Sequence, residues 1–136
     1  MERIYASIMA KKVLIVDDNA ANRDLLVDVL ERFRPYGVEI LSADNGSQAL
    51  EIIEREAPDL VLLDIMMPQM SGYEVCQRIK ANPALAGVYI IMVSAKTQQE
   101  DRRQAVQVGA NEYVTKPFDI GLIRERVQAI LDVKPL

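Results

Sequence analysis

The sequence predicts an α/β fold in which one five-stranded parallel sheet carries helices on both of its faces. Five short aliphatic or β-branched runs alternate with five longer segments of helical period. Strict alternation of this kind favours a parallel sheet with right-handed crossovers. Two of the runs, 13–16 and 60–63, are apolar throughout, as is typical of strands that are covered on both faces.

The predicted strands are short runs that end at turn residues or at polar side chains. The second of them is expected at an edge of the sheet. In chain order the predicted strands are 13–16, 38–43, 60–63, 89–93 and 112–115.

The predicted helices repeat apolar residues at a spacing of three or four, which places one apolar stripe against a core. The first helix is expected to stop at Pro35 and Gly37, and the fourth at Gly109. Asp119 is a suitable N-cap for the last helix. The predicted helices are 20–33, 47–56, 73–82, 98–108 and 120–131. The apolar stripe of the first helix is Leu25, Leu26, Val29, Leu30 and Phe33.

Composition excludes several classes of protein. The formal net charge of −4 disfavours direct binding to nucleic acid, which needs clustered Lys and Arg. The sequence has no histidine, so imidazole chemistry is excluded. The one cysteine, Cys76, is expected to be a small core residue. Because no apolar run approaches the roughly 20 residues that span a bilayer, we expect a cytoplasmic protein that does not associate with membranes.

Polar side chains follow the predicted strands at the points where the strands end. Asp17 and Asp18 follow the first run, Asp64 the third, Ser94 the fourth and Lys116 the fifth. In an open parallel sheet these ends meet at one edge, where ligands bind. Each residue alone has a simpler explanation, such as a helix cap or a turn. Their joint placement at one edge is what favours a functional site.

These residue types suit phosphoryl transfer that is assisted by a metal ion. Three carboxylates at one edge raise each other's pKa, a cost that a hard divalent cation between them offsets. Magnesium prefers oxygen ligands, an ammonium suits a phosphate oxygen, and a carboxylate can form an aspartyl phosphate. Asp64 is therefore the expected nucleophile.

Five stretches of sequence carry a resemblance to a known family. They are Val-Leu-Ile-Val-Asp-Asp at 13–18, Asp-Leu-Val-Leu-Leu-Asp-Ile-Met-Met-Pro at 59–68, Ser-Gly-Tyr-Glu at 71–74, Val-Ser-Ala at 93–95 and Gly-Ala-Asn-Glu-Tyr-Val-Thr-Lys-Pro-Phe at 109–118. Together they resemble the receiver domain of two-component response regulators, over roughly 11–131. The resemblance implies a flavodoxin-like (βα)5 doubly wound fold with strand order 2-1-3-4-5.

The resemblance also implies a metal site and a phosphoacceptor. Asp17, Asp18 and Asp64 match the residues that hold magnesium, and Met66 matches the residue whose backbone carbonyl completes the protein's share of the ligands. Asp64 matches the aspartate that accepts the phosphoryl group.

Further matches concern the phosphoryl group and the response to it. Ser94 matches the hydroxyl residue that contacts the phosphoryl group, where Thr is more frequent, and Lys116 matches the lysine that pairs with Asp64 and then with the phosphate. Tyr113 matches the aromatic residue that turns inward on activation. In this family Lys116 and Pro117 are joined by a cis peptide bond.

The function implied by the resemblance is a phosphorylation-dependent signalling switch. A histidine kinase or phosphotransfer protein supplies the phosphoryl group, and the domain catalyses only its own phosphorylation and dephosphorylation. A downstream protein effector reads the state, with phosphorylation-dependent homodimerisation as a further expectation. Residues 1–10 are expected to be an N-terminal extension and residues 11–133 the receiver domain, without an output domain.

Two other functions fit the sequence less well. A phosphatase of the haloacid dehalogenase type needs a second aspartate two residues after its nucleophile, but Met66 stands two residues after Asp64 and Asn19 two after Asp17. A flavin or nucleotide binder needs a loop after the first strand that is rich in glycine or hydroxyl groups. The acidic pair at that place would repel a phosphate in the absence of a metal ion.

Overall fold

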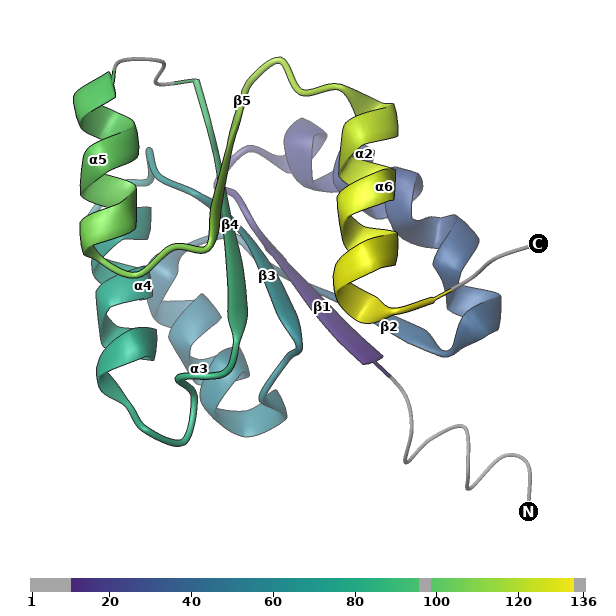
Figure 1. The fold of residues 1–136 in the computed structure, drawn as a ribbon, viewed down its shortest axis with the longest axis horizontal. Helices are drawn as coiled ribbons and strands as arrows, with labels where there is room; N and C mark the ends of the chain where they lie inside the picture. The colour runs from purple at the N-terminus through teal and green to yellow at the C-terminus, as the bar shows by residue number, and fades with distance from the viewer. Residues whose placement is uncertain (1–10, 96–98, 134–136) are drawn as a thin grey trace.

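The computed structural model describes residues 11–95 and 99–133. Within these ranges the strands form one parallel sheet in the order β2-β1-β3-β4-β5 (Figure 1). This confirms the predicted strand order and the edge position of the second strand. The strands are β1 (Lys11–Val16), β2 (Val38–Ala43), β3 (Leu60–Asp64), β4 (Tyr89–Ser94) and β5 (Glu112–Thr115).

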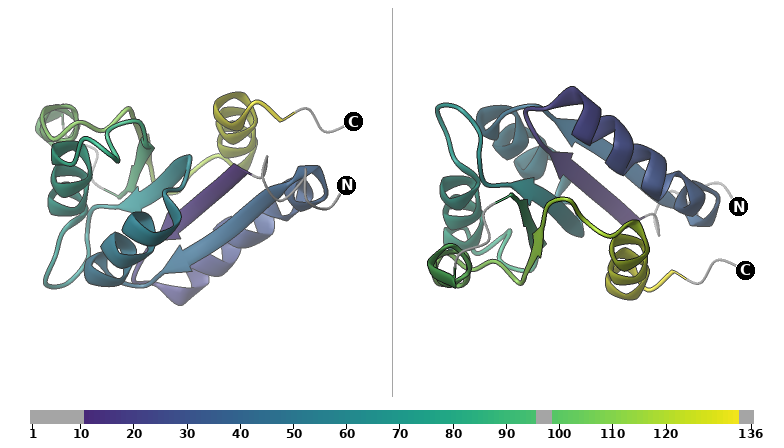
Figure 2. Two further views of the ribbon diagram at one scale, coloured as in Figure 1. Left: turned by 90° about the horizontal axis from the view of Figure 1, so that it is seen from below. Right: turned by 90° about the horizontal axis from the view of Figure 1, so that it is seen from above.

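Helices cover both faces of the sheet, as the alternation of elements predicts. In Figures 1 and 2, α3, α4 and α5 lie on one face, and α2 and α6 lie on the other. The helices are α2 (Ala20–Leu30), α3 (Gly46–Glu56), α4 (Gly72–Ala81), α5 (Gln99–Gln107) and α6 (Ile120–Leu131), with a 3-10 helix η1 (Glu31–Tyr36) after α2. None of the described helices is both long enough and apolar enough to cross a membrane.

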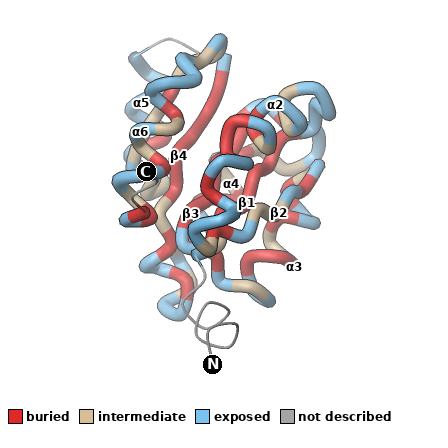
Figure 3. Tube along the Cα trace, turned by 90° about the vertical axis from the view of Figure 1, so that its right-hand side faces the viewer, coloured by how far each residue is buried: buried red, intermediate tan, exposed pale blue. Residues whose placement is uncertain are grey.

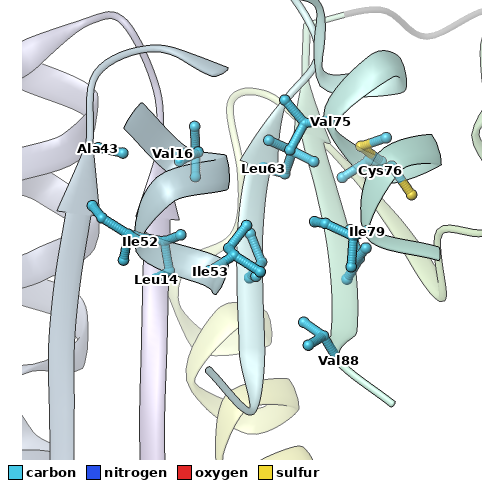
Figure 4. Close-up of a cluster of buried hydrophobic side chains, with 14 of the residues drawn as sticks. Leu14, Val16, Ala43, Ile52, Ile53, Leu63, Val75, Cys76, Ile79 and Val88 are labelled. Carbon is cyan, nitrogen blue, oxygen red and sulfur yellow. The ribbon is translucent and has the colours of Figure 1, made fainter. Parts of the chain in front are cut away.

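The sheet separates two clusters of buried side chains: the first cluster lies between the sheet and α3, α4 and α5, and the second lies between the sheet and α2 and α6. Successive residues of a strand point to opposite faces, so Leu14 and Val16 pack with α3 and α4, whereas Val13 and Ile15 pack with α2 and α6. Figure 3 shows that the central strands are buried along most of their length, and Figure 4 shows part of the first cluster. The strands that carry the polar edge are therefore fixed from both sides.

Cys76 lies in the first cluster and is fully buried, which confirms its prediction as a core residue (Figure 4). Burial raises the pKa of its thiol to about 11. A thiol with such a pKa stays protonated near neutral pH and is a poor nucleophile.

The first helix is shorter than predicted, because an α-helix cannot continue through Pro35. Proline lacks the N–H that the helix needs, and its ring clashes with the carbonyl four residues before it. The chain instead tightens into η1 after Leu30 and leaves it at Gly37, whose φ of 88° suits glycine. Phe33 remains fully buried within η1.

Leu25 departs from the predicted apolar stripe of the first helix. This residue is 43% exposed, whereas Leu26, Val29, Leu30 and Phe33 are buried. The stripe is thus narrower than the sequence pattern indicated. Leu25 lies in a surface groove that also includes Phe118 and Ile120, beside Lys116.

Candidate functional site

Four strands bring the predicted site residues to one edge of the sheet. Asp17 follows β1 directly, Asp64 and Ser94 are the last residues of β3 and β4, and Lys116 follows β5. The strand register aligns Asp64 with Val93, beside Ser94. Asp17, Asp64 and Ser94 are buried, in contrast to the exposed Asp18. The edge therefore concentrates charge at the boundary between the core and solvent.

The three aspartates form a cluster that could hold a metal ion. One carboxylate oxygen from each of Asp17, Asp18 and Asp64 lies within 4.8 Å of the other two. Oxygen donors of this kind are the ligands that hard divalent cations prefer. The backbone N–H of Met66 donates a hydrogen bond to Asp64 Oδ1 at 3.3 Å, which keeps the backbone of residue 66 next to the cluster.

Lys116 lies between two of these carboxylates. Its Nζ is 2.8 Å from Asp17 Oδ2 and 3.5 Å from Asp64 Oδ2. The resemblance implied a pairing with Asp64, but the shorter contact is to Asp17. The backbone N–H of Lys116 donates to the carbonyl of Ser94 at 2.7 Å, and the Lys116–Pro117 peptide bond is cis, as the resemblance implies.

Burial raises the pKa of the Asp64 carboxyl group to about 6. The negative charge of Asp17 contributes to this rise, and the ammonium of Lys116 opposes it. The expectation that the clustered carboxylates raise each other's pKa is therefore met at Asp64, although desolvation is the larger cause.

Two residues for which no role in the site was predicted hold Asp17 in place. The backbone N–H of Asn19 donates to Asp17 Oδ1 at 2.9 Å, and Arg23 Nη1 donates to the Asp17 carbonyl at 2.7 Å. Asn19 also caps α2 by accepting a hydrogen bond from the backbone of Asn22. The available signal was an asparagine at a helix start with an arginine one turn later.

Ser94 and Tyr113, the predicted switch residues, are in contact. Tyr113 is half-buried against the first core cluster and hydrogen-bonds with Ser94. Burial raises the pKa of the Tyr113 hydroxyl, while the hydrogen bond to Ser94 lowers it. The ring thus already occupies an inward position in this structure.

Arg102 on α5 stacks on the ring of Tyr113, with 4.9 Å between its guanidinium carbon and the ring centroid. Arg102 is exposed to solvent, yet it also makes this contact with the ring. A cation at this distance from an aromatic face is attracted by the ring. Arg102 therefore favours the inward position of Tyr113.

Two arginines of α6, Arg124 and Arg126, have other partners. Arg126 forms two hydrogen bonds with Glu112, and it holds the pKa of that carboxyl group below its usual range. Arg124 points toward α2, where its Nε is 3.5 Å from the carbonyl oxygen of Val29.

Met66 and Met67 differ sharply in exposure. Met66 is 58% exposed, whereas Met67 is buried in the first core cluster. Both line a surface groove with Pro68, Ser71 and Tyr73. Met66 thus lies open to solvent beside the aspartate cluster. Lys96, two residues after Ser94 in the sequence, lies outside the described residues.

Residues 13–128 match the family model of the response regulator receiver domain. The chain therefore belongs to the response regulator receiver domains, which are phosphorylation-dependent signalling switches. The match covers every residue of the polar edge described above.

Curated relatives and solved structures agree with this assignment. The phosphate regulon transcriptional regulatory protein PhoB of Pseudomonas aeruginosa is 39% identical over 124 residues, or 91% of this chain and 53% of the relative. The alkaline phosphatase synthesis transcriptional regulatory protein PhoP of Bacillus subtilis is 38% identical over 123 residues, which are 90% of this chain and 49% of the relative. The chain thus spans about half the length of these relatives.

Two solved structures illustrate the similarity of fold. The signal receiver domain of a DNA binding response regulator from Colwellia psychrerythraea has a TM-score of 0.84 at 30% identity, over 90% of this chain and 98% of that chain. The chemotaxis protein CheY4 of Vibrio cholerae has a TM-score of 0.79 at 26% identity, over 89% of this chain and 98% of that chain.

Removal of the Asp64 charge is expected to stabilise the metal-free protein above pH 6. Between its unfolded pKa of 3.8 and its folded pKa of about 6, the folded state binds more protons than the unfolded state, so stability falls as the pH rises. In chelator at pH 7.5, Asp64→Asn should raise the free energy of unfolding by about 1–2 kcal/mol, which allows for screening by solvent. Urea unfolding at pH 4 and pH 7.5 measures this difference, which should be small at pH 4.

The control is Asp24→Asn, which changes an exposed carboxylate on α2 and should alter stability by less than about 0.5 kcal/mol. A variant Asp64→Asn that is less stable than the parent at pH 7.5 in chelator would contradict the expectation.

Loss of the Arg102 side chain is expected to shift Tyr113 outward. An exposed cation–π contact contributes about 0.5–1 kcal/mol, so Arg102→Ala should lower the ratio of inward to outward rings by roughly two- to fivefold. Nuclear Overhauser contacts between the Tyr113 ring and Ser94 report this ratio. Arg103→Ala, which alters the exposed neighbour on α5, should leave it unchanged; equal effects of the two variants would argue against the contact.

Proposed function

We propose that Asp64 is the phosphoacceptor of this receiver domain, and that the domain catalyses its own phosphorylation and dephosphorylation. The observation that carries the proposal is the convergence of three carboxylates, one ammonium and one hydroxyl at the same edge of the sheet. This set combines a nucleophile with the groups that stabilise a phosphoryl group in transfer.

In the proposed reaction a carboxylate oxygen of Asp64 attacks the phosphorus of the donor. A bond forms between that oxygen and phosphorus while the bond from phosphorus to the donor's leaving group breaks, and the leaving group keeps the electron pair. Lys116, now 2.8 Å from Asp17 and 3.5 Å from Asp64, has the charge and reach to hold a phosphoryl oxygen. The hydroxyl of Ser94 donates a hydrogen bond to another.

We propose magnesium as the cofactor, held by Asp17, Asp18, Asp64 and the backbone carbonyl of Met66. The donor set is made of hard oxygen atoms, which suits this ion. Its positive charge, when bound, offsets the repulsion between an anionic donor and the carboxylates. The chain's own share is to hold Asp17 in place through Asn19 and Arg23.

The proposed response passes through Ser94 and Tyr113. When the Ser94 hydroxyl turns toward a phosphoryl group on Asp64, its present hydrogen bond with Tyr113 must change. The surface formed by α5, β5 and α6 would then differ between the two states, as a two-state switch requires. Arg102 biases this equilibrium toward the inward ring.

We further propose a histidine kinase or a phosphotransfer protein as the phosphodonor and a protein as the effector. Homodimerisation through α5, β5 and α6 in the phosphorylated state is part of this proposal. Two of the relatives are transcriptional regulators about twice as long as the region that matches this chain, which supports an effector domain in those proteins. A cytoplasmic location stays a prediction from the sequence.

Acetyl phosphate with magnesium is expected to phosphorylate the chain at Asp64. Intact-mass spectrometry should detect one added phosphoryl group in the parent, and none in Asp64→Asn or in the parent with chelator. The control Asp59→Asn, at the other end of β3, should accept the group like the parent. Incorporation that survives Asp64→Asn would refute the assignment.

Replacement of Met66 by asparagine is expected to shorten the lifetime of the phosphorylated form. Hydrolysis needs a water molecule in line with the breaking bond, and the thioether of Met66 orients water poorly, whereas an amide can donate and accept hydrogen bonds. One such bond, at about 1 kcal/mol, corresponds to roughly fivefold faster decay. Met66→Leu keeps an apolar side chain and should decay like the parent; an unchanged rate in Met66→Asn would sink the prediction.

A further inference from the structure

Gly72, the first residue of α4, packs directly against the backbone of Asp64. A Cβ atom added at Gly72 would lie 2.3 Å from the Asp64 carbonyl oxygen and 2.8 Å from the Ile65 Cα. Real Cβ atoms essentially never approach another atom below 3.0 Å. Both obstacles are backbone atoms, which cannot turn aside as the end of a side chain can. A side chain at this position would therefore have to displace the end of β3 or the start of α4.

The backbone conformation of Gly72 does not by itself call for glycine. Among the described glycines the positive φ angles belong to Gly37 and Gly109, whereas Gly72 is helical. Alanine stabilises a helix relative to glycine. The close approach to Asp64 is thus the constraint that this glycine satisfies.

Hydrogen bonds tie the start of α4 to the end of β3. The carbonyl of Ile65 accepts from the backbone N–H of Gly72 at 3.0 Å and from that of Met67 at 3.1 Å. Ser71 caps α4 by accepting from the backbone N–H of Glu74 at 3.3 Å. A shift of the first turn of α4 therefore moves Asp64 and Ile65 at the end of β3.

We propose that Gly72 is a positioning residue for Asp64. Its missing side chain lets α4 seat against the strand end, and this contact fixes the Asp64 carboxylate relative to Asp17, Asp18 and Lys116. The inference rests on the proposed role of Asp64. With a Cβ at residue 72, the distance from that atom to the Asp64 carbonyl oxygen would have to grow from 2.3 Å to at least 3.0 Å. Productive sites tolerate displacements of their reacting groups of only about 0.5 Å.

The test compares Gly72→Ala with Gly46→Ala. Gly46 is also the buried first residue of a helix, α3, and its added Cβ would lie 2.9 Å from the Cβ and 3.0 Å from the Cγ of Met70. The two variants thus make the same chemical change at the same helical position. They differ in whether the new methyl group presses on the backbone of Asp64 at 2.3 Å or on the side chain of Met70 at 2.9 Å.

Two measurements are made on each folded variant. The first is the rate of phosphoryl uptake from acetyl phosphate, normalised to the folded fraction by circular dichroism. The second is MgCl2 titration followed by the amide signals of Asp64 and Ile65, which reports the metal site without any reaction. We expect Gly72→Ala to slow uptake by about 10- to 100-fold and to weaken Mg2+ binding. Gly46→Ala should stay within about twofold of the parent in both measurements.

A second pair of variants decides the matter if Gly72→Ala does not fold. Ser71→Ala removes the N-cap of α4, and Asn45→Ala removes that of α3, which accepts from Gln48 at 2.8 Å. We expect Ser71→Ala to slow uptake and weaken Mg2+ binding, and Asn45→Ala to do neither. The inference would be overturned if the α4 variants, Gly72→Ala and Ser71→Ala, matched the α3 variants, Gly46→Ala and Asn45→Ala, in uptake rate and in Mg2+ binding. Uptake by the parent that does not depend on Asp64 would instead reject the proposed function itself, and the inference with it.

Discussion

The ion pairs of Lys116 are the interaction on which the polar edge depends. Asp17 and Asp64 are both almost fully buried, and two neighbouring carboxylates in such surroundings repel each other strongly. Lys116 contacts both of them, and its backbone is tied to the end of β4 through the carbonyl of Ser94. The ends of β1, β3, β4 and β5 are thus connected through one side chain and its own backbone.

The packed sheet holds the carboxylates of Asp17 and Asp64 together, despite their repulsion, because it fixes the backbone of both residues. β1 and β3 are buried on both faces, so the positions of Asp17 and Asp64 follow from packing that involves neither carboxylate. The raised pKa of Asp64 is a sign that the site opposes its own ionisation. Sites of this kind reduce stability in exchange for reactivity.

Much of the fold follows from the sequence because hydrophobic period and burial agree in the central strands. The all-apolar runs at 13–16 and 60–63 are buried, and the residues after the strands do meet at one edge. The strand order came from the resemblance, since alternation of strands and helices alone does not fix it. The sequence analysis also overestimated the first helix: Pro35 was expected to end it after Phe33, but the α-helix ends at Leu30 and the 3-10 helix η1 follows.

What the sequence could not reveal are contacts between elements whose distances are set by the packing of helices on the sheet. Arg23 on the Asp17 carbonyl, Arg102 on the Tyr113 ring and Gly72 against Asp64 depend on how helices seat on the sheet. Periodicity gives the face of a helix that is buried, but not its seating to within an ångström. The same limit explains why Leu25 was assigned to the core.

The division of the core by the sheet has a consequence for how such a domain can diverge. The helices α2 and α6 rest on one cluster of side chains, and α3, α4 and α5 rest on the other. Substitutions in separate clusters that share no contacts have nearly additive effects on stability. One layer can therefore accumulate changes under selection for a new binding specificity while the other keeps its packing. The strands between the two layers of helices keep the residues of the polar edge in the same positions during such changes.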